Sequence, residues 1–149
     1  YHTLRFNYRG VGASAGSHDM GTGEVDDAEA VAAWLQEKYP NLPVTLLGFS
    51  FGGFVAAALG ARLETQGRVP SKLFMVAPAV HRLTAETPSA SQCPLVVIQP
   101  DTDEVIEPQA VYDWSANLGR VHELLKVAEC GHFFHGKLTD LKDLLLPRL

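Results

Sequence analysis

The strongest chemical signal in the sequence is the run Gly48-Phe49-Ser50-Phe51-Gly52. It matches the pattern G-x-S-x-G, and it lies between an apolar segment and an Ala-rich one, the context of a sharp strand-to-helix turn. Glycines two positions before and after the serine remove side chains that would clash in such a turn. The hydroxyl would lie at a helix N-terminus, where the N–H of Phe51 could donate to an oxyanion. We therefore predict that Ser50 is a nucleophile; the alternative is a glycine-rich turn with a capping serine.

A serine nucleophile needs a general base, and two histidines late in the chain could supply it. His132 follows Gly131 and comes just after a predicted strand, where side chains reach the carboxyl edge of a parallel sheet. His135 lies three residues further along and is the rival. We predict His132 as the base because a glycine precedes it. The structural alternative is a histidine that only caps or borders the core.

An acidic loop after the preceding predicted strand offers the group that would orient the histidine. It contains Asp101, Asp103, Glu104 and Glu107. Only one carboxylate is needed, to accept a hydrogen bond from the histidine ring and stabilise the imidazolium. Most acidic loop residues are simply solvated. Spacing alone does not choose among these four.

Secondary-structure elements must position these residues. Short apolar runs alternate with longer helical patterns along the chain, and this alternation predicts a parallel sheet covered by helices. No linker or repeat divides the chain, so one domain is expected over residues 1–149. The segment Ala77–Gln92 is expected to be a loop near the site, too short for a cap domain. The predicted strands are Thr3–Asn7, Val44–Gly48, Lys72–Val76, Leu95–Gln99 and Val121–Val127, and the predicted helices are Glu24–Tyr39, Phe51–Leu63, Pro108–Leu118 and Leu138–Leu145.

Composition argues against several other classes of protein. A chain of 149 residues that is 46% hydrophobic and 19% charged fits a globular domain with a real core. Its net charge of -5 and scattered basic residues predict no binding to nucleic acid or to an anionic membrane. No apolar run approaches the roughly 20 residues of a membrane span, and the first residues lack a secretory signal, which predicts a cytoplasmic protein. Cys93 and Cys130 lack metal-ligand spacing, so no disulfide, metal or cofactor is expected.

Taken in order, these motifs resemble the α/β-hydrolase superfamily, in particular its small, cap-less bacterial esterase-like members. The run Gly48–Gly52 matches the nucleophile elbow of the family, and Gly131-His132-Phe133 matches its terminal G-H-x motif. The run Arg9–Ser14 resembles the R-G-x-G-x-S turn after the fourth strand of the family. The run Asp103–Ile106 resembles the D-x-V-[VI] acid loop, and this resemblance assigns the acid to Asp103 rather than Asp101. The implied fold is a mostly parallel α/β sheet with helices on both faces, a three-layer sandwich.

The chain departs from the family pattern at its N-terminus, because it would begin at the fourth of eight strands. The domain is therefore predicted to be N-terminally incomplete. The absent third strand lies, in the family, between the fourth and fifth, and its following loop supplies a second oxyanion donor. Only Phe51 is therefore named as a donor. On this interpretation Thr3–Asn7 and Val44–Gly48 do not pair directly; direct pairing would instead indicate a reduced five-stranded sheet.

The residues and the resemblance together imply acyl transfer to water by a Ser-His-Asp triad of Ser50, His132 and Asp103. The expected partner is a small-molecule acyl substrate, with no nucleic acid and no membrane, and no oligomeric state is assigned. The alternatives are a non-catalytic binding domain on the same fold, or a peptidase, thioesterase or lactonase. The residues predicted to line the acyl pocket are Phe49, Pro78 and Val80.

Overall fold

The computed structural model describes residues 2–83, 93–120 and 122–149. The chain forms two compact units, Tyr1–Leu42 and Pro43–Leu149. The first unit contains one helix, α1 (Thr22–Lys38), among its described residues. In chain order, the second unit contains β1 (Thr45–Phe49), α2 (Phe51–Thr65), β2 (Lys72–Val76), β3 (Leu95–Pro100), α3 (Pro108–Ala116), β4 (Glu123–Val127) and α4 (Leu138–Leu145), with single 3-10 turns at Val80–Arg82 and Leu146–Arg148.

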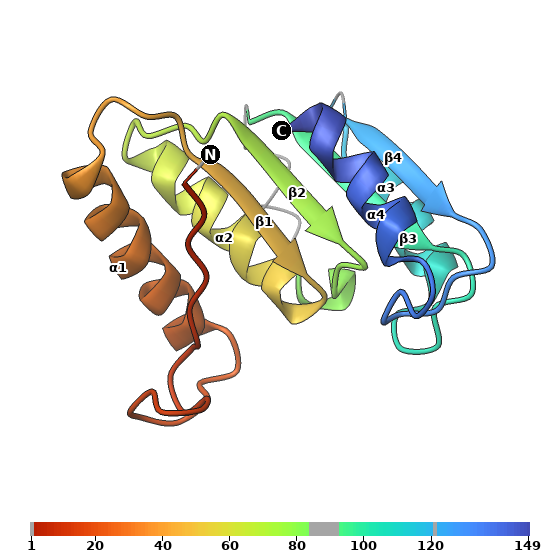
Figure 1. Cartoon of the computed structure of the whole chain (residues 1–149), viewed down its shortest axis with the longest axis horizontal. Coiled ribbons are helices and arrows are strands. Elements are labelled where there is room, and N and C mark those ends of the chain that lie inside the picture. Colours follow the sequence, from red (N-terminus) through yellow and green to blue (C-terminus); the bar gives the residue numbers. More distant parts are fainter. Residues whose placement is uncertain (1, 84–92, 121) are drawn as a thin grey trace. The chain divides into compact units, whose positions relative to one another are not determined.

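The second unit is built on a four-stranded, all-parallel sheet in the order β1-β2-β3-β4 (Figure 1). Each of the first three strands is followed by a connection long enough to return the chain to the same end of the sheet, as parallel pairing requires. All four carboxyl ends therefore lie along one edge, where side chains from the following loops can meet. The fold class predicted from the sequence, a parallel α/β sheet flanked by helices, is confirmed.

Helices cover both faces of this sheet. On one face, Leu73 and Val97 of the strands pack in a buried cluster with Ala57 of α2 and Val111 of α3. On the other face, a second cluster of alternate strand residues packs against Leu141, Leu144 and Leu145 of α4. The strands β2 and β3 are apolar on both faces, which is the pattern of strands buried between two helical layers. The result is a three-layer sandwich with α4 on one side and α2 and α3 on the other (Figure 1).

Local sequence features explain the helix boundaries. The helix α1 ends one residue before Tyr39, ahead of Pro40, and its buried Val25, Ala28 and Ala32 share one face. Pro108 occupies the first position of α3, where its missing N–H costs no hydrogen bond. The four predicted helices and four of the five predicted strands are confirmed, with ends that differ by at most two residues. Residue 121, where the fourth of these strands was predicted to begin, lies outside the described residues.

The strand predicted at Thr3–Asn7 is absent: these residues are exposed and form no strand. A strand is stable only when a neighbour accepts its backbone hydrogen bonds, and an apolar alternation alone does not supply one. The sheet has four strands with β1 at one edge, so the reduced five-stranded sheet is not formed. In the segment Ala77–Gln92, Val80–Arg82 forms a single 3-10 turn, and residues 84–92 lie outside the described part of the chain.

Candidate active site

The turn between β1 and α2 has the backbone geometry that the serine motif requires. Ser50 has φ 53° and ψ -116°, a conformation that side chains rarely adopt and that marks stored strain. A Cβ on Gly48 would collide with the carbonyl oxygen of Gly52, so this close approach needs glycine. The N–H of Ser50 donates to the carbonyl of Val76 at 2.8 Å, and the N–H of Ala79 donates to the carbonyl of Ser50 at 3.2 Å. The strained residue is thereby held against the carboxyl end of β2.

His132 reaches this serine from the loop after β4. The loop is closed by a tight turn in which Phe134 N donates to the carbonyl of Gly131 at 3.0 Å. The ring is buried, and its Nε2 lies 3.0 Å from Ser50 Oγ, although the two residues are 82 positions apart in the sequence. The rival, His135, is exposed and makes no hydrogen bond to Ser50 in the described part of the chain. The structure thus brings the predicted base and nucleophile within hydrogen-bond reach.

Asp103 faces the opposite side of the same imidazole ring. Its carboxylate oxygens Oδ2 and Oδ1 lie 2.9 and 3.0 Å from His132 Nδ1. The backbone N–H groups of Val105 and Ile106 also donate to Oδ1, at 2.8 and 2.7 Å, which fixes the carboxylate. Because a carboxylate only accepts, Nδ1 must carry the proton, and Nε2 is left to accept from Ser50. This tautomer is the one in which the histidine can act as a base toward the serine.

Gln99 is a further member of the site that sequence reasoning missed. Its side chain is fully buried, and its Nε2 donates to Asp103 Oδ2 and to the carbonyl of Pro100, each at 3.1 Å. Its Oε1 is buried without a hydrogen-bond partner among the described residues. A signal was present in the sequence, because Gln99 is the one polar side chain in the buried strand Leu95–Pro100. A buried polar side chain usually has a specific partner.

The other carboxylates of the acidic loop have separate roles. Glu104 Oε2 accepts the backbone N–H of His132 at 2.9 Å, and this hydrogen bond lowers the pKa of the Glu104 carboxyl. Asp101 Oδ1 accepts the backbone N–H of Cys130, in the loop after β4, at 3.4 Å. Glu107 is the N-cap residue of α3 and makes no side-chain capping hydrogen bond. Neither Asp101 nor Glu107 touches the histidine ring.

The predicted acyl-pocket residues lie in different surroundings. Phe49 is 41% exposed, and its ring centroid lies 4.9 Å from that of His132. Pro78 is fully buried, and its Cβ would be 3.3 Å from a Cβ on Gly53. Val80 is buried in the core cluster that covers one face of the sheet. Of the three, only Phe49 therefore presents a side chain to solvent. The predicted oxyanion donor, Phe51, is the first residue of α2.

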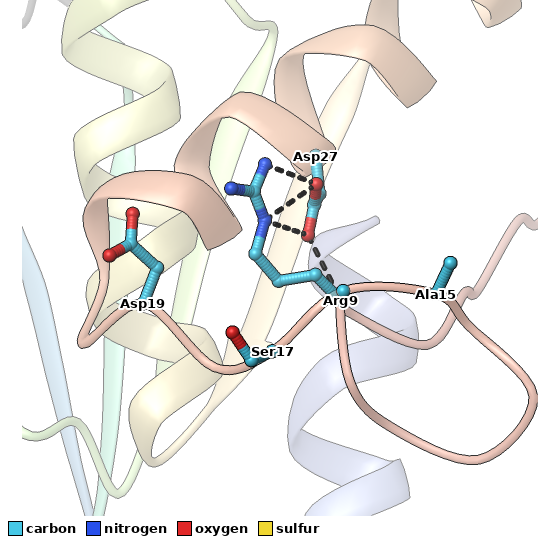
Figure 2. Close-up of a pocket in the computed structure, with 6 residues that line it drawn as sticks. Arg9, Ala15, Ser17, Asp19 and Asp27 are labelled. Carbon is cyan, nitrogen blue, oxygen red and sulfur yellow. Dashed lines mark hydrogen bonds and ion pairs between the residues drawn. The ribbon is translucent and has the colours of Figure 1, made fainter.

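The first unit contains a separate open cavity of about 480 Å³ (Figure 2). The guanidinium of Arg9 on its wall forms an ion pair with Asp27 at 2.8 Å, and Asp19 accepts the N–H of Gly23 at 3.1 Å. The run Gly10–Gly16 has the spacing Gly-x-Gly-x-x-x-Gly, which could suggest a dinucleotide-binding turn. That turn needs a helix that opens within the glycines, whereas α1 begins only at Thr22. The residues lining this cavity are Arg9, Ala15, Gly16, Ser17, Asp19 and Asp27.

Three further structural findings concern metals, thiols and membranes. The described residues contain no group of three or more His, Cys, Asp or Glu side chains that could hold a metal ion. Cys93 and Cys130 are both buried, and burial raises the pKa of the Cys93 thiol to about 11. Across residues 2–83, 93–120 and 122–149, no helix is both long enough and apolar enough to cross a membrane.

Comparison with known proteins gives a consistent assignment. The family model for the alpha/beta hydrolase fold matches residues 1–92. An alpha-beta serine hydrolase homologue from Coxiella burnetii is similar over 97% of this chain and 67% of its own, with a TM-score of 0.84 and 34% identity. A serine hydrolase without a lid from Xanthomonas campestris is similar over 93% of this chain and 61% of its own, with a TM-score of 0.83 and 44% identity.

A curated relative, an uncharacterised protein of Rickettsia prowazekii, is 33% identical over 94% of this chain. The chain spans 61% of the length of that relative. The family match covers more than half of the chain, and the parallel sheet, the strained serine turn and the similar solved structures agree with it. The chain belongs to the α/β-hydrolase fold family.

Proposed function

We propose that this chain carries the catalytic residues of a serine hydrolase that cleaves a carboxylic ester or a related acyl bond. The observation that carries the proposal is the continuous contact from Asp103 through His132 to Ser50, at 2.9 and 3.0 Å, ending on a strained serine. Each contact fits one role: acid, base and nucleophile. In an arrangement of this kind the serine is activated by these side chains, without a metal or cofactor.

In the acylation step, Ser50 Oγ attacks the substrate carbonyl carbon while His132 Nε2 takes the hydroxyl proton. The imidazolium that forms is stabilised by the Asp103 carboxylate, which remains ionised. The carbonyl oxygen becomes an oxyanion, and the proposed donor to it is the N–H of Phe51 at the positive end of α2. His132 then protonates the leaving group, and the carbon–leaving-group bond breaks to leave an acyl-serine.

In the deacylation step, water repeats the attack. His132 Nε2 takes a proton from the water, and the resulting hydroxide adds to the acyl carbon. The tetrahedral intermediate collapses as the carbon–Oγ bond breaks and His132 returns its proton to Ser50. Burial of the ring supports this cycle, because hydrogen bonds and charges interact more strongly where water is excluded.

The proposed substrate is a small acyl ester. Phe49 precedes the nucleophile and lies beside the ring of the base, where an exposed apolar surface can contact a bound substrate. The buried positions of Pro78 and Val80 support a role in shaping the core under the nucleophile turn. Direct substrate contact is therefore proposed for Phe49 alone.

Labelling and turnover test the proposal. The intact protein and its Ser50→Ala variant would be treated with a fluorophosphonate probe and assayed against p-nitrophenyl esters, acyl thioesters and peptides. We expect labelling and ester hydrolysis by the unchanged protein, and loss of both in the variant. Absence of labelling in a correctly folded protein would favour the non-catalytic binding domain. Faster turnover of thioesters or peptides would replace the ester assignment while retaining the nucleophile.

A further inference from the structure

Two loops meet beside the proposed base, and one hydrogen bond between them takes no part in the proposed acyl transfer. Glu104, in the loop after β3, accepts the backbone N–H of His132, in the loop after β4, at 2.9 Å. The two residues are 28 positions apart, so the bond links segments that only the tertiary fold brings together. We propose that Glu104 is a positioning residue that holds the backbone of His132 at catalytic distance from Ser50. This inference rests on the proposed function.

Adjacent residues of one loop hold the histidine at two points. Asp103 accepts from the ring at Nδ1, which sets the rotation of the imidazole. Glu104 accepts from the backbone N–H, which sets the place from which the ring extends. Neither contact alone determines where Nε2 lies. Because a displacement of about 1 Å can cost on the order of 100-fold in rate, holding both points protects the 3.0 Å approach to Ser50.

Gly131 leaves space for the Glu104 oxygen that makes this contact. Its φ is not positive, so its backbone conformation does not require glycine. A Cβ at this position would instead lie 2.7 Å from Glu104 Oε2, closer than real Cβ atoms approach. The missing side chain makes room for the carboxylate that reaches the next residue. The hydrogen bond and the glycine are therefore two parts of one arrangement.

The competing interpretation is a surface carboxylate that only stabilises a loop. Glu104 is exposed, and exposed hydrogen-bonding groups contribute little to folding. The hydrogen bond from the His132 N–H is the largest cause that lowers the pKa of the Glu104 carboxyl, so the contact itself favours the ionised acceptor. A purely structural role would change stability and leave kcat unchanged. A positioning role would lower kcat with little change in KM or in the thermal midpoint.

The first experiment compares Glu104→Ala and Glu104→Gln with a matched control, Glu107→Ala, in the intact protein. Glu107 is an exposed acid of the same loop that does not contact His132. We expect Glu104→Ala to lower kcat by on the order of 10- to 100-fold, with KM and the thermal midpoint close to those of the control. Glu104→Gln keeps an oxygen that can accept the same N–H, so it should recover most of kcat. A kcat for Glu104→Ala within twofold of the control would overturn the proposal.

The second experiment uses Gly131→Ala, which should push the Glu104 carboxylate away from the His132 N–H. We expect Gly131→Ala to lose about as much kcat as Glu104→Ala, and the double variant to lose no more than either. Additive losses would contradict a shared arrangement. Ser50→Ala separates this inference from the proposed function. If ester turnover survives in Ser50→Ala, both fail; if it is abolished while Glu104→Ala and Gly131→Ala are unaffected, only the role of Glu104 fails.

Discussion

Asp103 Oδ2 and His132 Nδ1 lie 2.9 Å apart in a buried site, and no other carboxylate of the acidic loop contacts the ring in the described residues. The backbone N–H groups of Val105 and Ile106 hold Asp103 in this orientation. A carboxylate fixed by its own loop can hold the ring in one tautomer without help from solvent. The expected consequences of this geometry can be measured.

Asp103→Asn should impair turnover far more than Asp101→Asn. An asparagine amide at position 103 can donate to Nδ1, which favours the tautomer in which Nε2 carries the proton and cannot accept from Ser50. We expect a fall in kcat of roughly 10³- to 10⁴-fold for Asp103→Asn. Asp101→Asn should stay within a few-fold, because the Asp101 carboxylate accepts a hydrogen bond from the backbone N–H of Cys130 and not from the histidine ring. Steady-state kinetics on one ester would decide, and equal, mild losses would show that the acid is assigned wrongly.

Gln99→Leu should separate catalysis from stability. The substitution removes the Nε2 donor to Asp103, so we expect kcat to fall by about tenfold. It also removes Oε1, a buried acceptor without a partner among the described residues, and this gain offsets part of the lost hydrogen bonding. The free energy of unfolding should therefore change by no more than about 1 kcal/mol. Chemical denaturation and kinetics on the same preparation would test both parts.

Gln99→Glu is the matched comparison for that variant. It keeps the size of the side chain but introduces a second carboxylate beside buried Asp103. Repulsion between the two acids and the cost of burying an additional charge should make this variant less stable than Gln99→Leu. If Gln99→Glu is as stable and as active as the unchanged protein, the Gln99 side chain does not donate a hydrogen bond to Asp103.

Both thiols should be unreactive in the folded protein. Burial raises the pKa of Cys93 to about 11 and also raises that of Cys130, so little thiolate forms at pH 8. We expect a chromogenic disulfide reagent to modify neither cysteine within minutes at pH 8, and to modify two thiols per chain after denaturation. Rapid modification of one thiol under native conditions would mean that its segment opens readily.

An ion pair near the C-terminus should make stability depend on pH in a defined direction. Arg148 donates from Nε and Nη2 to the Glu123 carboxylate, at distances from 2.6 to 3.0 Å, and these bonds lower the pKa of Glu123. The Glu123 carboxyl therefore binds a proton less readily in the folded state than in the unfolded state. The contribution of this ion pair to the free energy of unfolding is fully present above the ordinary glutamate pKa, and it is lost as the pH falls through the lowered pKa of Glu123.

Arg148→Ala tests this dependence. The variant should have a lower thermal midpoint than the unchanged protein at pH 7, and the difference should shrink as the pH falls below the lowered pKa of Glu123. The effect should be small, because both side chains are partly exposed to solvent. Lys142→Ala is a control, because Lys142 is more exposed and its contact to Asp143 is 3.9 Å long. A difference that grows on acidification would contradict the assigned sign.

Local sequence signals determined much of this protein. The strands β2 and β3 are continuous apolar runs, and the serine turn between β1 and α2 combines glycines at defined positions with an adjoining Ala-rich helix. These patterns operate over a few residues, so they predicted the element types, most of their boundaries and the conformation of the turn at Ser50. The order of the motifs then predicted that a histidine and an acid would follow.

Tertiary structure decided what depends on residues far apart in the chain. Thr3–Asn7 has a strand-like composition but forms no strand, because a strand requires a hydrogen-bonded neighbour. In the sequence, four acids of one loop are equal candidates for the acid. In the fold, the loop after β3 approaches the loop after β4, so that Asp103 contacts the ring of His132 and Glu104 contacts its backbone N–H.

The roles of Gln99 and Gly131 likewise come from contacts made across the sheet edge. Gln99 is only a polar residue in an apolar strand until the folded chain places its amide on Asp103. In the sequence, Gly131 is a loop glycine with no evident role. In the fold, the carboxylate of Glu104 lies where a Cβ at position 131 would collide with it. Neither contact can be read from neighbouring residues in the sequence. Hydrogen bonds and close packing between two loops depend on where the sheet brings those loops together.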